Sequence, residues 1–183
     1  MKPTDNEIIT LMSHPLQKEK GLRVLMDTYQ SRLYWYIRRL VVEHETAQDI
    51  LQDTFIKAYQ HFHQFKQDSK LYTWLYRIAT NEALQHLNKM KKMQKTDTNA
   101  EIYLINQVAE NANHSAEEIQ IILQKAIQTL PEKQKLVFTM RYYDELPYDE
   151  MSEILNMSVG TLKTNYHYAK QKIEEYISQN YND

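Results

Sequence analysis

The residues whose types and spacing best suit a chemical role lie in the segment Leu146–Lys172. Acidic residues crowd the start of this segment, whereas no Asp or Glu occurs between Ile154 and Ile173. The acid-free part carries hydroxyl, amide, imidazole and ammonium groups, which make hydrogen bonds with phosphates and with the edges of bases. Its candidate contact residues are Thr161, Lys163, Thr164, Asn165, His167, Tyr168 and Lys170. This set predicts contact with nucleic acid.

Two helices and a tight turn are needed to position these groups. The first helix is predicted by apolar residues at helical spacing, which are Tyr148, Met151, Ile154 and Leu155. Asn156 suits a left-handed turn position, and Ser158 can cap the second helix through its hydroxyl. The inner face of the second helix consists of Leu162, Tyr166, Ala169 and Ile173. The pattern indicates a helix-turn-helix, although a surface helical hairpin fits the same spacing equally well.

A second polar group lies far upstream in the chain. Asp49, Gln52 and Asp53 stand at positions i, i+3 and i+4, so they share one helical face, away from the apolar positions. Carboxylates on such a face can pair with arginines of a partner protein. Taken alone, the stripe fits the solvated face of an amphipathic helix better.

No arrangement of residues indicates catalysis. The seven histidines form no metal-binding H-x-x-x-H pair, and His61 and His63 point to different faces of a helix. With Cys 0 and Gly 2 the chain has neither a thiol nucleophile nor a phosphate-binding glycine loop. We therefore expect no enzymatic activity, no metal, no cofactor and no small-molecule substrate.

Composition favours an all-α protein that stays inside the cell. Gly 2 and Pro 4 in 183 residues leave few helix breakers. The first ten residues lack the basic and apolar regions of a signal peptide, and no apolar stretch reaches membrane-spanning length. A net charge of -2 argues against general binding to polyanions, but the run Lys89–Lys95 is locally basic. We expect a cytoplasmic location without membrane insertion.

Two small helical domains are predicted, joined by a polar linker. Apolar periodicity in the first half indicates a helical bundle, with helices over 22–42, 46–62 and 71–92. In this bundle Thr46 is the expected N-cap of the second helix. In the second half a capping box at 115–118 opens a helix through Thr129, and Pro131 begins the next helix of a four-helix domain. The expected divisions are a first domain of residues 1–95, a linker of 96–114 and a second domain of 115–183.

Three blocks together resemble one family. AQDILQDTFIKAY at 47–59 looks like the core-binding helix of sigma-70-type transcription initiation factors. TWLYRIATNEAL at 73–84 resembles a segment of the compact extracytoplasmic-function (ECF) branch of that family. The stretch 130–163 is similar to the promoter-reading domain of the same branch. The order and spacing of the blocks make the resemblance specific.

The resemblance implies roles for the polar groups. Asp49, Gln52 and Asp53 would dock on core RNA polymerase. The loop 66–70 would capture an extruded promoter base, and the next helix would line the melted strand, a task suited to aromatic rings beside cations. The residues concerned are Lys66, Ser69, Lys70, Tyr72, Trp74, Arg77 and Asn81. Trp74 also fits a core anchor, and that interpretation is the stronger one for it. A partner anti-sigma factor that occludes both domains is implied by the resemblance alone.

Some positions depart from the family pattern. Members often carry arginine where this chain has Thr80, Asn88, Asn165 and Tyr168. Fewer cations predict a weaker contribution of phosphate contacts to binding. We expect an alternative sigma factor that binds core polymerase and directs promoter-specific initiation. The alternatives are a stand-alone helix-turn-helix regulator, which would dimerise to match paired half-sites, and a helical interaction protein without DNA contact.

Overall fold

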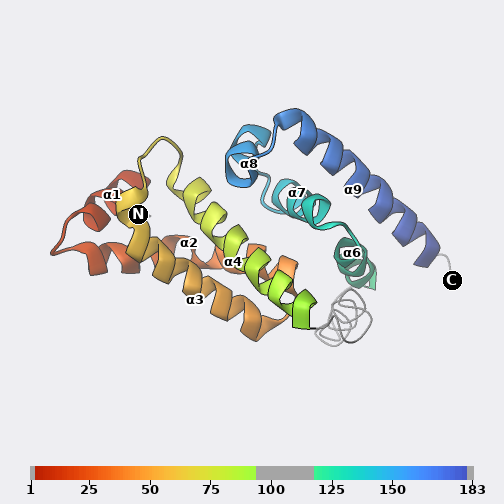
Figure 1. Ribbon diagram of the computed structural model, residues 1–183, viewed down its shortest axis with the longest axis horizontal. Coiled ribbons are helices and arrows are strands. Elements are labelled where there is room, and N and C mark those ends of the chain that lie inside the picture. Colours follow the sequence, from red (N-terminus) through yellow and green to blue (C-terminus); the bar gives the residue numbers. More distant parts are fainter. Residues whose placement is uncertain (1–2, 94–117, 181–183) are drawn as a thin grey trace.

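The computed structural model describes residues 3–93 and 118–180, and every regular element within these ranges is helical. In chain order the elements are α1 (Asp5–Ser13), α2 (Lys18–Val41), α3 (His44–His61), the 3-10 turn η1 (Phe62–Gln64), α4 (Leu71–Met93), α6 (Glu118–Gln128), α7 (Glu132–Tyr142), α8 (Tyr148–Leu155) and α9 (Val159–Asn180). The all-α fold class is thus confirmed. Helices α1 to α4 form one group and α6 to α9 a second (Figure 1).

The first group is built on a bundle in which α2, α3 and α4 pack against one another. Its core residues include Leu33, Ile37 and Leu40 of α2, Phe55 and Ala58 of α3, and Leu75, Ala79 and Ala83 of α4. Two buried hydroxyls in this core satisfy each other, because Tyr36 and Thr80 form a hydrogen bond of 2.8 Å. Thr80, one of the positions where the family often carries arginine, is therefore a core residue here.

Helix α1, which sequence analysis did not predict, covers the start of α2. Its N-terminus is closed by a capping box in which Thr4 and Glu7 bond to each other's backbone N–H. The contact between the two helices is close at Gly21, where an added Cβ would lie 2.7 Å from the backbone nitrogen of Met12. Glycine is needed at this position because any larger residue would push the helices apart.

In the second group, α9 packs against α6, α7 and α8. A small cluster beneath it consists of Ala126, Ile127, Leu130, Phe138, Ala169 and Ile173. Helix α8 is closed by the C-cap residue Asn156, which has the left-handed angles φ 52° and ψ 48°. The hydroxyl of Ser158 then accepts a hydrogen bond of 3.1 Å from the N–H of Thr161. Both turn residues act as predicted, so the helix-turn-helix is confirmed.

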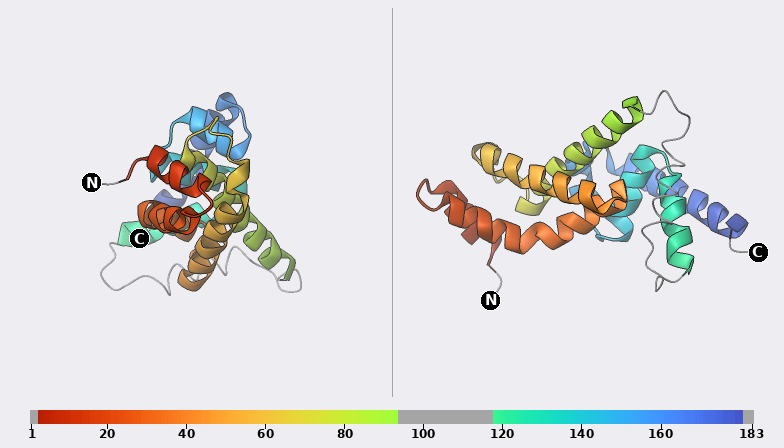
Figure 2. Two further views of the ribbon diagram at one scale, coloured as in Figure 1. Left: turned by 90° about the vertical axis from the view of Figure 1, so that its left-hand side faces the viewer. Right: turned by 90° about the horizontal axis from the view of Figure 1, so that it is seen from below.

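The two groups are docked against each other. Helix α7 lies on α2 and α8 lies on α4 (Figure 2). One apolar cluster runs through both groups, and its members from the second group are Leu136, Val137, Met140, Leu146, Met151, Ile154 and Leu162. Sequence analysis made no prediction about this docking.

One predicted helix start was wrong. Helix α3 begins at His44 after the N-cap Glu43, and the hydroxyl of the expected cap, Thr46, bonds instead to the Glu43 carboxylate. The reason lies in Val42, whose positive φ of 66° ends α2. Only Val42 and Glu43 then separate α2 from α3, so α3 begins earlier than predicted. The predicted linker and the capping box at 115–118 lie wholly or largely outside the described residues.

Candidate functional site

The predicted contact residues of α9 lie on the outer face of the helix. Thr161, Lys163, Thr164, His167, Tyr168 and Lys170 are exposed, and Asn165 is half-buried. The Asn165 amide donates a hydrogen bond of 2.9 Å to the carbonyl of Thr161, so part of its hydrogen-bonding capacity is used within the helix. The inward-facing Leu162 and Ala169 are buried. Helix α9 thus presents the face that was predicted.

The acidic stripe of α3 is also exposed. Asp49, Gln52 and Asp53 lie together on the outer face of the helix, while the neighbouring Ile50 and Phe55 are buried. The structure therefore brings these three polar side chains to one surface that a partner can reach.

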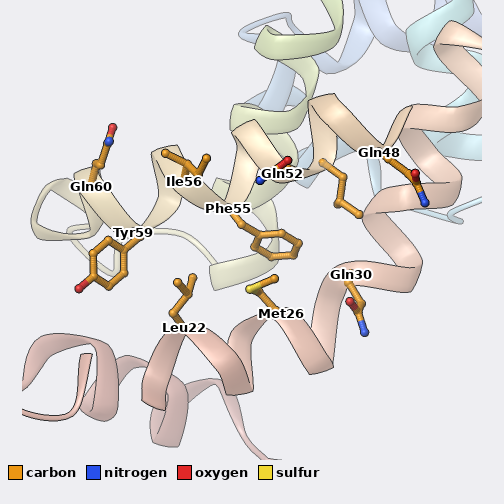
Figure 3. A pocket seen from close by; sticks show the side chains of 10 residues that line it. Leu22, Met26, Gln30, Gln48, Gln52, Phe55, Ile56, Tyr59 and Gln60 are labelled. Carbon is orange, nitrogen blue, oxygen red and sulfur yellow. The ribbon is translucent and has the colours of Figure 1, made fainter. Parts of the chain in front are cut away.

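Beside this stripe lies an apolar groove that sequence reasoning missed. Its volume is about 500 Å³, and α2 and α3 form its walls (Figure 3). The lining residues are Leu22, Met26, Gln30, Gln48, Leu51, Gln52, Phe55, Ile56, Tyr59 and Gln60. Gln52 belongs to both the stripe and the groove. One signal was present in the sequence, because the apolar Ile56 follows the polar Gln52 by four residues and so shares its helical face. In the structure Ile56 is 45% exposed.

An aromatic cluster supports the loop between α3 and α4. The ring centroid of Trp74 lies 5.3 Å from that of Phe65 and 5.9 Å from that of Phe62. Trp74 is half-buried, which agrees with the anchoring interpretation given above. The side chains of Lys66 and Asn81 are exposed, and Ser69 is half-buried.

Three other predicted DNA-contact residues are engaged by α8. Lys70 Nζ lies 2.7 Å from a carboxylate oxygen of Glu150, and the Tyr72 hydroxyl donates to the second oxygen of the same carboxylate. Arg77 donates a hydrogen bond of 2.7 Å to the backbone carbonyl of Glu153. Partial burial acts to raise the pKa of Glu150, but the hydrogen bonds from Lys70 and Tyr72 outweigh it and hold that pKa below its ordinary value.

A further polar cluster, centred on Asp144, joins α2 to the second group. Arg32 donates hydrogen bonds of 3.0 Å to the Tyr76 hydroxyl and 3.2 Å to the Asp144 carbonyl. Arg39 lies 3.8 Å from the Asp144 carboxylate and stacks over the Tyr143 ring at 4.1 Å. Sequence analysis missed this cluster, although the seven-residue spacing of the two arginines, which places them on one helical face, was visible.

Burial dominates the electrostatics at Asp144. It raises the pKa of this carboxyl to about 6, although Arg39 and Arg32 act in the opposite direction. Within the described residues no group of three or more His, Asp or Glu is placed to hold a metal ion. No helix in the same ranges is long and apolar enough to cross a bilayer.

Comparisons with known proteins match both helix groups. Residues 25–93 match the family model of Sigma-70 region 2, and residues 120–173 match that of Sigma-70, region 4. The ECF RNA polymerase sigma factor SigW of Bacillus subtilis is 32% identical over 163 residues, which cover 84% of this chain and 87% of the relative. The RNA polymerase sigma-H factor of Pseudomonas aeruginosa is 30% identical over 166 residues, which cover 86% of each chain.

Solved structures share the fold. CnrH, solved in complex with the cytosolic domain of CnrY, superimposes with a TM-score of 0.70 at 15% identity, covering 96% of this chain and 98% of that one. RpoE of Bartonella quintana, solved with the anti-sigma factor NepR, gives a TM-score of 0.66 at 20% identity, covering 88% and 99%.

The sequence relatives and both family models place this chain in the sigma-70 family, among the extracytoplasmic-function sigma factors. It is an alternative sigma factor, which directs promoter-specific transcription by RNA polymerase. The alternative of a stand-alone regulator is not favoured.

Proposed function

We propose that the α3 stripe and the adjoining groove form the surface through which this sigma factor binds core RNA polymerase. Asp49, Gln52 and Asp53 would pair with basic side chains of the polymerase. The groove would bury apolar side chains of the same partner, and Gln52 would contact both parts. The support is the exposure of all three polar residues beside a groove of about 500 Å³.

The start of α4 and the loop before it are proposed to hold the melted upstream promoter element. Cations and polar groups there would bind the strand, namely Lys66, Ser69, Lys70, Tyr72, Arg77 and Asn81. Trp74 would act mainly by packing on Phe62 and Phe65 and so fixing the loop. Aromatic and cationic groups that lie together are suited to unstacked bases.

Helix α9 is proposed to read the more distant promoter element in the major groove. The single observation that carries this role is its exposed, acid-free face, which follows a left-handed turn and a capping serine. The residues concerned are Thr161, Lys163, Thr164, Asn165, His167, Tyr168 and Lys170. We assign polymerase binding and promoter melting to a domain of residues 1–95. The contact of α9 with the more distant promoter element is assigned to a domain of residues 115–183.

We further propose that an anti-sigma factor regulates the chain. CnrH and RpoE were each solved with another protein, the cytosolic domain of CnrY and the anti-sigma factor NepR respectively. A comparable partner would bind here and occlude both domains. The sigma factor would act in the cytoplasm with the polymerase and would itself catalyse no reaction.

Reconstituted transcription tests this assignment. Transcript 5′ ends mapped after overexpression identify the dependent promoters, and purified core polymerase is then assayed on one of them with and without the protein. We expect initiation at the mapped start only when the protein is present. If no promoter-dependent initiation and no binding to core polymerase are found, the proposed function is wrong.

A further inference from the structure

A stripe of exposed polar side chains runs along α4 from the strand-binding region to the end of the helix. Its members follow one another at spacings of three or four residues and are all exposed, namely Arg77, Asn81, Gln85, Asn88 and Lys92. Helix α4 is one continuous helix of 23 residues, so the stripe is unbroken (Figure 1). Only Arg77 and Asn81 belong to the residues proposed to bind the melted strand, and the rest of the stripe has no assigned role.

The stripe carries no acidic residue. Glu82 is the only acid in α4, and its carboxylate lies 2.6 Å from the ammonium of a lysine on α3, with 11% of the Glu82 side chain exposed. A further exposed cation, Lys89, follows Gln85 by four residues and precedes Lys92 by three, so it borders the stripe. The two lysines together with the amides of Gln85 and Asn88 form the distal stripe. Exposed ammonium and amide groups without acids among them are suited to the phosphates of nucleic acid.

The direction of α4 indicates which part of the promoter the distal stripe meets. The helix begins beside the loop that is assigned to the melted element, and beyond its end the chain continues toward the second group, which carries α9. Because α9 is assigned to the more distant promoter element, α4 points from the melted element toward the distant one. The DNA between these two elements is double-stranded, so the distal stripe faces a duplex.

We propose that the distal stripe binds the phosphate backbone of the duplex between the two promoter elements, about five base pairs from the melted strand. The distance follows from the helix, which rises about 16 Å from Asn81 to Lys92 at about 1.5 Å per residue, whereas successive phosphates of one strand lie about 3.4 Å apart along the duplex axis. Backbone contacts of this kind position the DNA without reading its sequence. The inference rests on the proposed function, because it takes α4 and α9 to bind the two elements.

A double-mutant cycle between protein and DNA tests this contact. The protein change is Lys89→Gln with Lys92→Gln. The DNA change is a methylphosphonate, which removes the charge of one phosphate, placed in turn at each position of the duplex between the two elements. The matched control is Lys20→Gln with Lys133→Gln, which removes two exposed lysine charges from α2 and α7. Affinity of the complex with core polymerase for a mapped promoter is measured at one fixed salt concentration, because phosphate contacts depend on salt.

With wild type and with the control, we expect a methylphosphonate about five base pairs from the melted strand to weaken promoter binding about five-fold. The same methylphosphonate should have no effect on the variant Lys89→Gln with Lys92→Gln, because the cations that face this phosphate are already absent. On the unmodified promoter this variant should bind about ten-fold more weakly than the control. Its thermal unfolding midpoint should match that of wild type, since both lysine side chains are exposed.

Two results overturn the contact while the proposed function stands. In the first, the wild-type complex initiates at the mapped promoter, but no phosphate between the elements is coupled to Lys89 and Lys92. In the second, the variant has a lower thermal unfolding midpoint and the same DNA affinity as the control, which would assign the two lysines to the negative C-terminal end of the helix. If the wild-type complex does not initiate at all, the proposed function and the contact both fall, because the distal stripe then has no promoter to bind.

Discussion

At the scale of single residues, the docking of the two helix groups leaves the Asp144 side chain only 6% exposed, and this burial changes its ionisation. Burial raises its pKa from 3.8 to about 6, so the folded chain binds this proton more tightly than the unfolded chain does. The resulting stabilisation is fully present below the unfolded pKa of 3.8 and is lost as the pH rises through about 6. The tyrosines that interact with Asp144 stay neutral in this window, because burial raises the pKa of Tyr36 and the pKa of Tyr76 above the ordinary tyrosine value.

Asp144→Asn should therefore remove a pH dependence. We expect the variant to match wild type in free energy of unfolding near about pH 4 and to exceed it by at most about 3 kcal/mol near about pH 8, since a shift of one pKa unit is about 1.4 kcal/mol. Urea titrations of both proteins across this pH range measure the difference in their free energies of unfolding. Groups that titrate alike in the two proteins do not contribute to this difference. If the variant were more stable than wild type by the same amount near about pH 4 and near about pH 8, Asp144 would not be protonated in the folded state.

Asp49 allows a residue-scale test of the polymerase surface. Asp49→Arg should weaken binding to core polymerase about ten-fold, because it reverses one charge of an exposed complementary surface. The thermal unfolding midpoint should not change, since the side chain is exposed. Titration of labelled protein with core polymerase provides the measurement, and Glu175→Arg on α9 is the matched control. Equal affinity of the two variants would remove Asp49 from the interface.

At the scale of elements, Gly21 sets how closely α1 and α2 approach. Gly21→Ala should lower the free energy of unfolding by about 1–3 kcal/mol, because its Cβ meets backbone atoms that cannot move away easily. Gly160→Ala in α9 is the contrasting substitution. Its Cβ would lie 3.9 Å from the Ser158 Oγ, an ordinary van der Waals distance, so the gain in helix propensity of up to about 1 kcal/mol should dominate. Chemical denaturation of both variants gives the comparison, and effects of the same sign would contradict the packing argument.

Sequence patterns predicted the elements well where the determinants are local. The left-handed Asn156, the capping Ser158 and the apolar stripe of α9 all lie within a few residues of the structure that they specify. The groove was missed for a physical reason. Helical periodicity counts Leu22 and Met26 among the apolar positions of the helix predicted over 22–42, but the gap between α2 and α3 leaves them only partly buried.

At the scale of the whole molecule, the pairing of the two helix groups could not be predicted from the sequence. It depends on Arg32 meeting Asp144 and on Lys70 meeting Glu150, residues that are far apart in the chain and belong to surfaces that look solvated when taken separately. Polar contacts between residues so far apart in the chain leave no periodic pattern in the sequence. Only the folded chain shows that both pairs meet beside the Tyr72 ring, whose centroid lies 5.1 Å from the Arg32 guanidinium and 5.6 Å from Lys70 Nζ.

The salt dependence of the complete initiation complex tests the role of α9. Neutralising Lys163 and Lys170 together, as Lys163→Gln with Lys170→Gln, should lower the slope of log affinity against log salt by about 2, because two phosphate contacts are lost. Promoter binding by the polymerase complex, measured across a salt series, gives this slope. The exposed Lys133 of α7 provides the control as Lys133→Gln. An unchanged slope for the double variant would place α9 away from the DNA backbone.

The apolar cluster shared by the two helix groups also bears on how the protein responds to its abundance. A contact within one chain is governed by a fixed effective concentration, so dilution does not weaken it and overproduction does not strengthen it. The fraction of molecules in which the two helix groups are docked is then the same in a cell with few copies as in one with many. Raising the copy number therefore leaves this fraction unchanged, whereas a ligand that binds the docked and separated arrangements with different affinity changes it.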